Sequence, residues 1–219
     1  MAGADRGHRR STLWAAVHAE RAALLADLEP LHDRQWTTRS LCSRWTVEQV
    51  VAHLTAAASV GWSRWLRSMV GAGFDAGRHN DRRLAEHLGP TPAATLAGFR
   101  GVVESTVAPT GDVPAWLGEV VVHGQDVRHP LGLPRRPAPA VVAVVAEFYA
   151  RRDFTVRSGS AAAGLHLVAT DSGFRHGPSD ASLVRGSTLA LTMALAGRSV
   201  FCDELDGAGV PVLRERAGG

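Results

Sequence analysis

Residues 36–54 of the chain, WTTRSLCSRWTVEQVVAHL, contain the start of a helix and its first turns. Thr46, followed three residues later by Gln49, matches a capping box, in which each side chain accepts a hydrogen bond from the other residue's backbone N–H. The apolar residues after this cap keep helical spacing: Val47, Val50, Val51, Leu54, Trp62 and Trp65. The stretch therefore predicts a helix with one buried face, and it places His53 on the flank of that face.

Helical patterns also lie on both sides of this stretch. Ser11 is a suitable N-cap for a first helix, whose apolar residues are Leu13, Val17, Leu24 and Leu28. Thr91 and Pro92 begin another helix, which continues through Leu96, Phe99, Val103 and Val107. Between these helices, residues 71–90 are polar and contain glycine, so we expect a long connection that could reach over a site.

The local signals of residues 115–128 conflict. Val120, Val121 and Val122 favour a strand. Gly118 and Gly124 would each cost a helix about 1 kcal/mol. Propensity alone therefore favours a strand here.

After Pro130 the sequence no longer consists mainly of helical patterns. A proline-rich linker precedes a helix at about 141–151, strands at 165–169 and 182–185, and a helix that begins after Ser187 and is closed by Gly197. A turn at 205–207 and an edge strand at 210–213 complete the pattern. We expect two domains, residues 1–136 and 137–219, of which the second is a small α/β unit.

Composition excludes several classes of protein. The 219 residues are 45% hydrophobic and 21% charged, as in an ordinary globular protein. The net charge is +3 and the arginines are scattered, so we expect no nucleic-acid partner. Cys42 and Cys202 have no CxxC spacing, which indicates a reducing compartment. With no signal-peptide pattern and no long apolar run, we expect a soluble cytoplasmic protein without a membrane partner.

Two segments carry residues suited to metal chemistry. On a helix, Glu119, His123 and Asp126 would share one face, since they are four and then three residues apart. His53 on a facing helix is the natural third ligand. Two histidines and one carboxylate suit catalytic zinc with an open position, and also non-haem iron. The same spacing also fits a solvated stripe, and His53 alone also fits a core histidine.

Both segments resemble motifs of one family. Residues 36–54 and residues 118–132, GEVVVHGQDVRHPLG, are similar to the two signatures of the mycothiol-dependent maleylpyruvate isomerase family, among the DinB-like metalloenzymes. The motifs occur in the same order as in that family. The resemblance extends to the tail through residues 184–186, 196–198 and 205–210.

The resemblance implies an α+β protein, with a DinB-like antiparallel four-helix bundle followed by the small C-terminal domain. It makes residues 119–128 helical despite their valines. It also implies a divalent metal, usually zinc, held by His53, Glu119 and His123. Mycothiol, a low-molecular-weight thiol, would be the cosubstrate at the open metal position. Asp126 becomes a candidate catalytic residue that orients a ligand or meets substrate.

Other side chains are candidates for binding and catalysis. Arginine binds anions through paired hydrogen bonds, so we expect a catalytic role for Arg128 and a cofactor-binding role for Arg82 and Arg83. Trp45, like Trp62 and Trp65, is expected in the core. Trp116 falls on the face of Glu119 and His123 and is a candidate cofactor contact. Cys42 is expected to pack in the core rather than replace the thiol cosubstrate.

Three functions are consistent with these residues. The first is a zinc-dependent, mycothiol-using S-transferase or cis–trans isomerase acting on a small electrophilic metabolite. The second is a metal-dependent hydrolase whose open position holds water and which needs no thiol. The third is a non-catalytic protein that binds a small molecule and would survive loss of the metal ligands.

Overall fold

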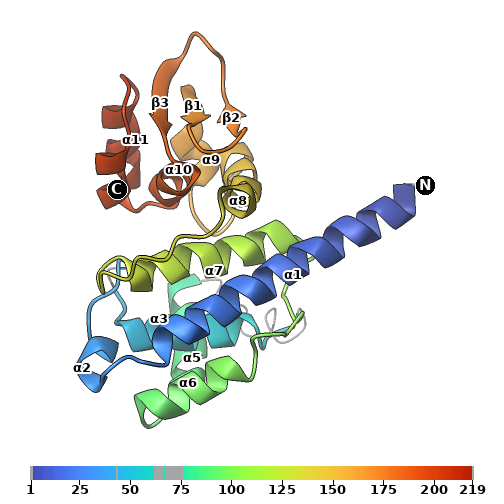
Figure 1. Ribbon diagram of the computed structural model, residues 1–219, viewed down its shortest axis with the longest axis vertical. Helices are drawn as coiled ribbons and strands as arrows, with labels where there is room; N and C mark the ends of the chain where they lie inside the picture. The colour runs from blue at the N-terminus through green and yellow to red at the C-terminus, as the bar shows by residue number, and fades with distance from the viewer. Residues whose placement is uncertain (1, 43, 62–66, 68–75, 219) are drawn as a thin grey trace. The chain divides into compact units, whose positions relative to one another are not determined.

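The structure is a computed structural model that describes residues 2–42, 44–61, 67 and 76–218 (Figure 1). The chain divides into two compact units, residues 1–135 and 136–219. Helices form the first unit, and helices with a small sheet form the second. This arrangement confirms the α+β fold class. No helix among the described residues is long and apolar enough to cross a membrane.

Four helices of the first unit form a ring around its core. In this ring α1 packs against α6 and α7, and α3 packs against the same two helices. The helix α5 packs on α3. The described helices of this unit are α1 Ala2–Leu28, α2 Asp33–Trp36, α3 Val47–Ala57, α5 Ala76–His87, α6 Pro92–Arg100 and α7 Val113–Arg128. The four-helix bundle that the resemblance implied is therefore present.

The capping box at the start of α3 forms as predicted. The backbone N–H of Gln49 donates to Thr46 Oγ1 at 3.4 Å, and the backbone N–H of Thr46 donates to Gln49 Oε1 at 2.9 Å. The buried face of α3 includes Val47, Val50, Val51 and Leu54. The helix ends at Ala57, and the expected continuation to Trp62 and Trp65 falls outside the described residues.

The helix predicted to run from Pro92 to Val107 is shorter than expected. It ends at Arg100 with Gly101 as its C-cap, and turns follow, so Val103 and Val107 lie beyond it.

Two further predictions for the first unit are wrong. Ser11 does not cap α1, because the helix begins at Ala2 and Ser11 lies inside it, donating to the carbonyl of His8. Residues 76–87 of the expected long connection form the helix α5. Their sequence is highly polar. Of the residues in α5 whose burial is described, Leu84 is the one that packs in the apolar core cluster. With Leu84 as the one buried apolar residue among positions 80–87, the sequence of this helix has almost no periodic pattern.

The valine-rich segment 113–128 is the helix α7, against its local propensity. Val120, Val121 and Val122 are all buried, because α7 has partners on more than one side in α1 and α3. Burial of these side chains outweighs their weak preference for strands and the cost of the two glycines. The helix that the resemblance implied is therefore correct.

The second unit contains a three-stranded sheet with strand order β2-β1-β3. The strand β1 pairs antiparallel with β2 and parallel with β3, with Leu167 opposite Val184. Ser187 caps α10 as predicted, and Gly197 beyond its end has φ +86°. The elements are α8 Pro139–Arg151, α9 Ser158–Ala162, β1 Leu165–Ala169, β2 Arg175–His176, β3 Ser182–Gly186, α10 Thr188–Leu195, the 3-10 helix η1 Ser199–Glu204 and α11 Val210–Ala217.

The edge strand predicted at 210–213 is wrong, because these residues begin the helix α11. Pro211 in the first turn removes no helical hydrogen bond, and Leu213 and Ala217, four residues apart, are both buried. The predicted turn before this helix is present. Gly207 there has φ +113°, and a Cβ would lie 2.2 Å from the carbonyl oxygen of Leu183. Only glycine fits this position.

Candidate metal centre

Two helices of the first unit bring three metal-ligating side chains together. His53 lies on α3, and Glu119 and His123 lie one helical turn apart on α7. The Nε2 atoms of His53 and His123 are 3.3 Å and 3.4 Å from the same atom, Oε2 of Glu119. One ligand atom from each residue lies within 4.8 Å of the other two. Together these three residues form what we call the His–Glu–His cluster.

Burial and mutual contacts set the charges of the cluster. Burial alone would raise the pKa of Glu119, but its hydrogen bonds with His123 and His53 outweigh burial and lower that pKa well below its ordinary value. Burial lowers the pKa of His53. Burial opposes protonation of His123 as well, yet its hydrogen bonds to Asp126 and Glu119 raise its pKa to about 9. The cluster thus holds an ionised carboxylate between two imidazoles.

Asp126 lies directly behind His123. Its side chain is fully buried, and its Oδ2 atom is 2.9 Å from Nδ1 of His123. A carboxylate at this nitrogen favours a proton on Nδ1, and in the neutral ring this leaves the lone pair on Nε2. Metal-bound histidines commonly have such a partner on the second nitrogen. The structure therefore brings Asp126 together with the cluster.

Arg128 lies against α1. Its Nε atom donates to Oδ2 of Asp27 at 2.7 Å, and only 1% of the Arg128 side chain is exposed. Its Nη2 atom is buried and has no hydrogen-bond partner among the described residues. Because the guanidinium is enclosed and paired, this position favours support of the α1–α7 pair over substrate contact. The expected catalytic role of Arg128 stays a prediction.

The three expected cofactor contacts lie outside the cluster. Arg82 and Arg83 are on α5, where Arg83 forms an ion pair with Glu86 at 2.7 Å. Trp116 precedes Glu119 by three residues on α7, and its Nε1 atom donates to the carbonyl of Thr110 at 3.1 Å. Cofactor binding by these residues stays a prediction.

Sequence reasoning placed Trp45 in the core and missed its contact with the cluster. Trp45 is indeed buried, but its ring centroid lies 4.6 Å from that of His53 and 6.1 Å from that of His123. The residue belongs to the first motif, eight positions before His53. Its location between two helical segments carries no periodic signal that could have revealed this contact.

The residues of the cluster suit a divalent metal. Two imidazole nitrogens and one carboxylate are the protein ligands of many catalytic zinc sites. The side chains are 12%, 15% and 12% exposed for His53, Glu119 and His123, so the centre is sheltered but reachable. Among the described residues, His53, Glu119 and His123 form the one group of three or more metal-binding side chains that lie close enough together to hold an ion.

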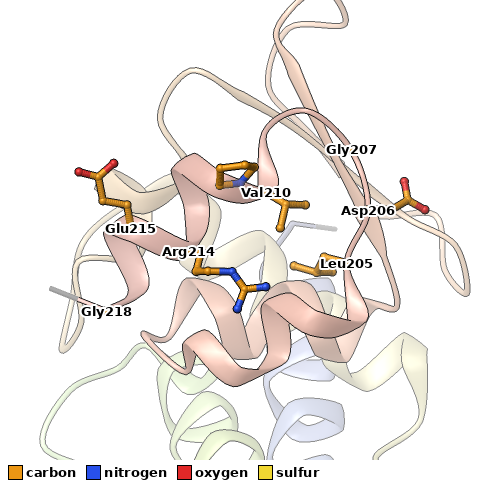
Figure 2. A pocket seen from close by; sticks show the side chains of 8 residues that line it. Leu205, Asp206, Gly207, Val210, Arg214, Glu215 and Gly218 are labelled. Atoms are coloured by element: carbon orange, nitrogen blue, oxygen red, sulfur yellow. The ribbon is translucent and has the colours of Figure 1, made fainter.

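The second unit has an open pocket of a different kind (Figure 2). Its volume is about 790 Å³. Leu205 and Val210 lie near the guanidinium of Arg214, which is paired with Asp203 at 2.8 Å. The lining residues are Leu205, Asp206, Gly207, Val210, Pro211, Arg214, Glu215 and Gly218. Its lining combines apolar side chains with charged ones, and none of these residues belongs to the group of described residues that could hold an ion.

Fold and site together define a helical-bundle protein with a buried His–Glu–His cluster between two of its helices. The profile of one family, the mycothiol maleylpyruvate isomerase N-terminal domain, matches residues 17–128. This segment is just over half of the chain and includes all three residues of the cluster. The chain therefore belongs to the mycothiol maleylpyruvate isomerase N-terminal domain family, as its motifs indicated.

Solved structures extend the likeness to the whole fold. A crystal structure of a histidine-to-alanine mutant of the mycothiol-dependent maleylpyruvate isomerase is 15% identical, with a TM-score of 0.60. A crystal structure of the mycothiol-dependent maleylpyruvate isomerase is 16% identical, with a TM-score of 0.56. Each alignment covers 91% of this chain and 92% of the other. No curated protein matches the sequence.

Proposed function

We propose that this protein is a metal-dependent enzyme that uses mycothiol to isomerise a small electrophile or to form its S-conjugate. The observation that carries the proposal is the convergence of His53, Glu119 and His123 in a bundle of this family. Two structures of the same fold are of a mycothiol-dependent maleylpyruvate isomerase, which supports a thiol cosubstrate. The electrophile of this chain need not be maleylpyruvate.

Zinc is the metal that the donor set favours. His53, Glu119 and His123 would hold it, and three protein ligands are the usual number in catalytic zinc sites. When bound, the ion would lower the pKa of a coordinated thiol, so that its sulfur is a thiolate at neutral pH. Non-haem iron uses the same kinds of ligand and is the alternative metal.

The side chains of the chain have distinct tasks in this proposal. Glu119 contributes one negative charge, which offsets part of the charge of a divalent ion. Asp126 accepts the Nδ1 proton of His123, so that Nε2 is the ring nitrogen that would give up its proton and bind the metal. Low exposure of all three ligands limits competition by bulk water. These roles follow from the positions of the residues and need no further side chain.

The thiol chemistry has two outcomes that share a first step. The thiolate sulfur forms a bond to one carbon of a conjugated double bond, and the electron pair moves into the electron-withdrawing group. In an isomerase the new single bond rotates, the C–S bond breaks and the thiolate leaves. In a transferase the adjacent carbon takes a proton and the conjugate is released. Catalysis requires the thiolate, which predicts complete dependence on added thiol.

A metal and activity assay tests the proposal. The purified protein, His53→Ala and His123→Ala are analysed for bound metal and assayed with mycothiol and maleylpyruvate, and with mycothiol and a maleimide as a second electrophile. We expect about one zinc per chain in the parent and loss of both zinc and turnover in the variants. His166→Ala, which alters a histidine of β1 in the second unit, is the matched control and should retain both.

Other outcomes would overturn the proposal. Turnover of an ester or amide without thiol would favour the hydrolase. Binding of a small molecule that survives both histidine substitutions would favour a non-catalytic binding protein. Circular dichroism of each variant separates loss of the metal from loss of the fold.

A further inference from the structure

Three aromatic rings are packed together at the His–Glu–His cluster. The His53 and His123 rings meet edge to face, with centroids 4.9 Å apart and an interplanar angle of 74°. The indole of Trp45 lies against both, at 4.6 Å from His53 with an angle of 36° and at 6.1 Å from His123 with an angle of 44°. Both imidazoles therefore pack against the indole of Trp45.

The two imidazoles are held in different ways. Both present Nε2 to Glu119, but His123 is also held at Nδ1 by Asp126. Among the hydrogen bonds between described residues, none holds Nδ1 of His53. A single hydrogen bond at Nε2 leaves an imidazole free to turn about its Cβ–Cγ bond unless packing prevents this. Among the described residues, the closest ring to His53 is the indole of Trp45.

The backbone fixes Trp45 firmly. The carbonyl oxygen of Trp45 accepts hydrogen bonds from the backbone N–H and the hydroxyl of Ser40, at 3.0 Å and 2.8 Å. The N–H of Trp45 donates to the carbonyl of Cys42 at 2.8 Å. In the same loop, the N–H of Leu41 donates to the carbonyl of Asp126 on α7 at 3.1 Å. The loop that carries the indole is thus tied to the helix that carries Glu119 and His123.

We infer that Trp45 is a positioning residue of the metal centre, whose indole sets the ring plane of His53 as Asp126 sets that of His123. The inference rests on the proposed metal site. An imidazole held in place before binding loses less rotational freedom when it becomes a ligand, and partners behind metal ligands typically change metal affinity 10- to 100-fold. Removal of the indole should therefore weaken metal binding even when the bundle stays folded.

Trp45 also belongs to the apolar core, so a test must separate stability from metal affinity. Trp36 is the matched control, because it is buried in the same core cluster and has no ring contact with His53 or His123 among the described residues. Trp45→Leu, Trp45→Phe, Trp36→Leu and Trp36→Phe are compared with the parent. Zinc affinity is measured by competition with a chromophoric chelator, and unfolding by urea is measured on metal-free protein. The absorption spectrum of the cobalt-substituted protein reports the ligand geometry.

We expect a graded result at position 45 alone. Trp45→Leu should bind zinc at least about tenfold more weakly and alter the cobalt spectrum, and Trp45→Phe should be about two- to fivefold weaker. Both Trp36 variants should lose stability but bind zinc within about twofold of the parent. If Trp45→Leu does not fold, the two phenylalanine variants still give the comparison.

Two results would count against the inference and differ in meaning. Equal zinc affinity of the Trp45 and Trp36 variants, with zinc bound by the parent, would overturn the role of Trp45 and leave the proposed function standing. A parent protein that binds no zinc, cobalt or iron would overturn both.

Discussion

The Oδ2 atom of Asp126 lies 2.9 Å from Nδ1 of His123 in the cluster. The carboxylate makes the imidazole a better ligand, because its charge stabilises positive charge that develops on the ring. We predict that Asp126→Asn binds zinc about tenfold more weakly than the parent, and that Asp126→Ala binds more weakly still. Chelator competition at pH 7.5 measures this.

The control for Asp126 is an exposed carboxylate that is not part of the cluster. Asp81 pairs with Arg44 on the surface at 2.6 Å, so Asp81→Asn should leave zinc affinity unchanged. Unaltered affinity in Asp126→Asn would show that this contact is only structural.

The two cysteines differ in accessibility, and neither is expected to replace the thiol cosubstrate. Cys202 is 1% exposed, and burial raises the pKa of its thiol, which reduces its thiolate fraction at any given pH. We predict that iodoacetamide at pH 8 alkylates Cys202 only after the protein is unfolded by urea, whereas Cys42, which is partly exposed, reacts in the native state. Mass spectrometry of peptides measures both sites. Rapid native labelling of Cys202 would contradict its burial.

Residue spacing was informative about the cluster, but only within α7. The intervals from Glu119 to His123 and from His123 to Asp126 place all three on one helical face, whatever the rest of the fold. His53 was suggested as the third ligand from its place on a helix expected to face this one, and the family resemblance implied the same set. Spacing alone could not decide between a ligand and a core histidine, because this depends on which helices pack together. The contact of Trp45 depends on the path of the loop at 38–46, which has no repeating pattern to read. Metal binding itself stays a prediction.

At the scale of elements, α7 contains a glycine, Gly124, with a buried side chain packed close to its Cα. A Cβ at position 124 would lie 2.8 Å from Nη1 of Arg128, whose guanidinium is buried. Glycine to alanine usually stabilises a helix by about 1 kcal/mol. We predict that Gly124→Ala instead destabilises the protein by about 1–2 kcal/mol, as expected for overpacking of a well-filled interior. Urea unfolding of the metal-free protein measures the change.

Gly98 on α6 is the matched control for this prediction. A Cβ there would meet only Thr55 Cγ2 at 3.8 Å, an ordinary contact. Gly98→Ala should therefore stabilise the protein by about 1 kcal/mol. Similar effects at both positions would mean that Arg128 yields to a Cβ without cost.

Elements were predictable where caps and apolar spacing coincide. Thr46, Thr91 and Ser187 each cap the helix that follows, as their sequences indicated. The helices α5 and α11 were missed because each buries few described residues, so that tertiary contacts rather than periodicity keep them helical. The helix α7 was difficult to predict for another reason. Its local sequence favours a strand, but burial against several neighbours makes the segment helical.

At the scale of the molecule, we propose that the two units are separate domains. The boundary predicted from the sequence, after Arg136, differs by one residue from the division of the structure after Arg135. Every residue of the cluster lies in the first unit. We predict that residues 1–136 expressed alone are helical by circular dichroism and bind zinc within about fivefold of the full chain. Cooperative urea unfolding and chelator competition measure the two properties.

The control is the shortened chain with His123→Ala. It should unfold at the same urea concentration as the unsubstituted shortened chain but bind no zinc. A shortened chain that is unfolded would show that the two units depend on each other. One that folds but does not bind zinc would show that the second unit is needed for the site.

All the donors of the centre, the carboxylate behind His123 and the indole beside His53 come from residues 45–126. Substitutions in residues 136–219 therefore change none of the side chains proposed to hold the metal. A variant altered only in residues 136–219 thus keeps every proposed ligand, so any change in its activity would have to arise without the loss of a donor atom.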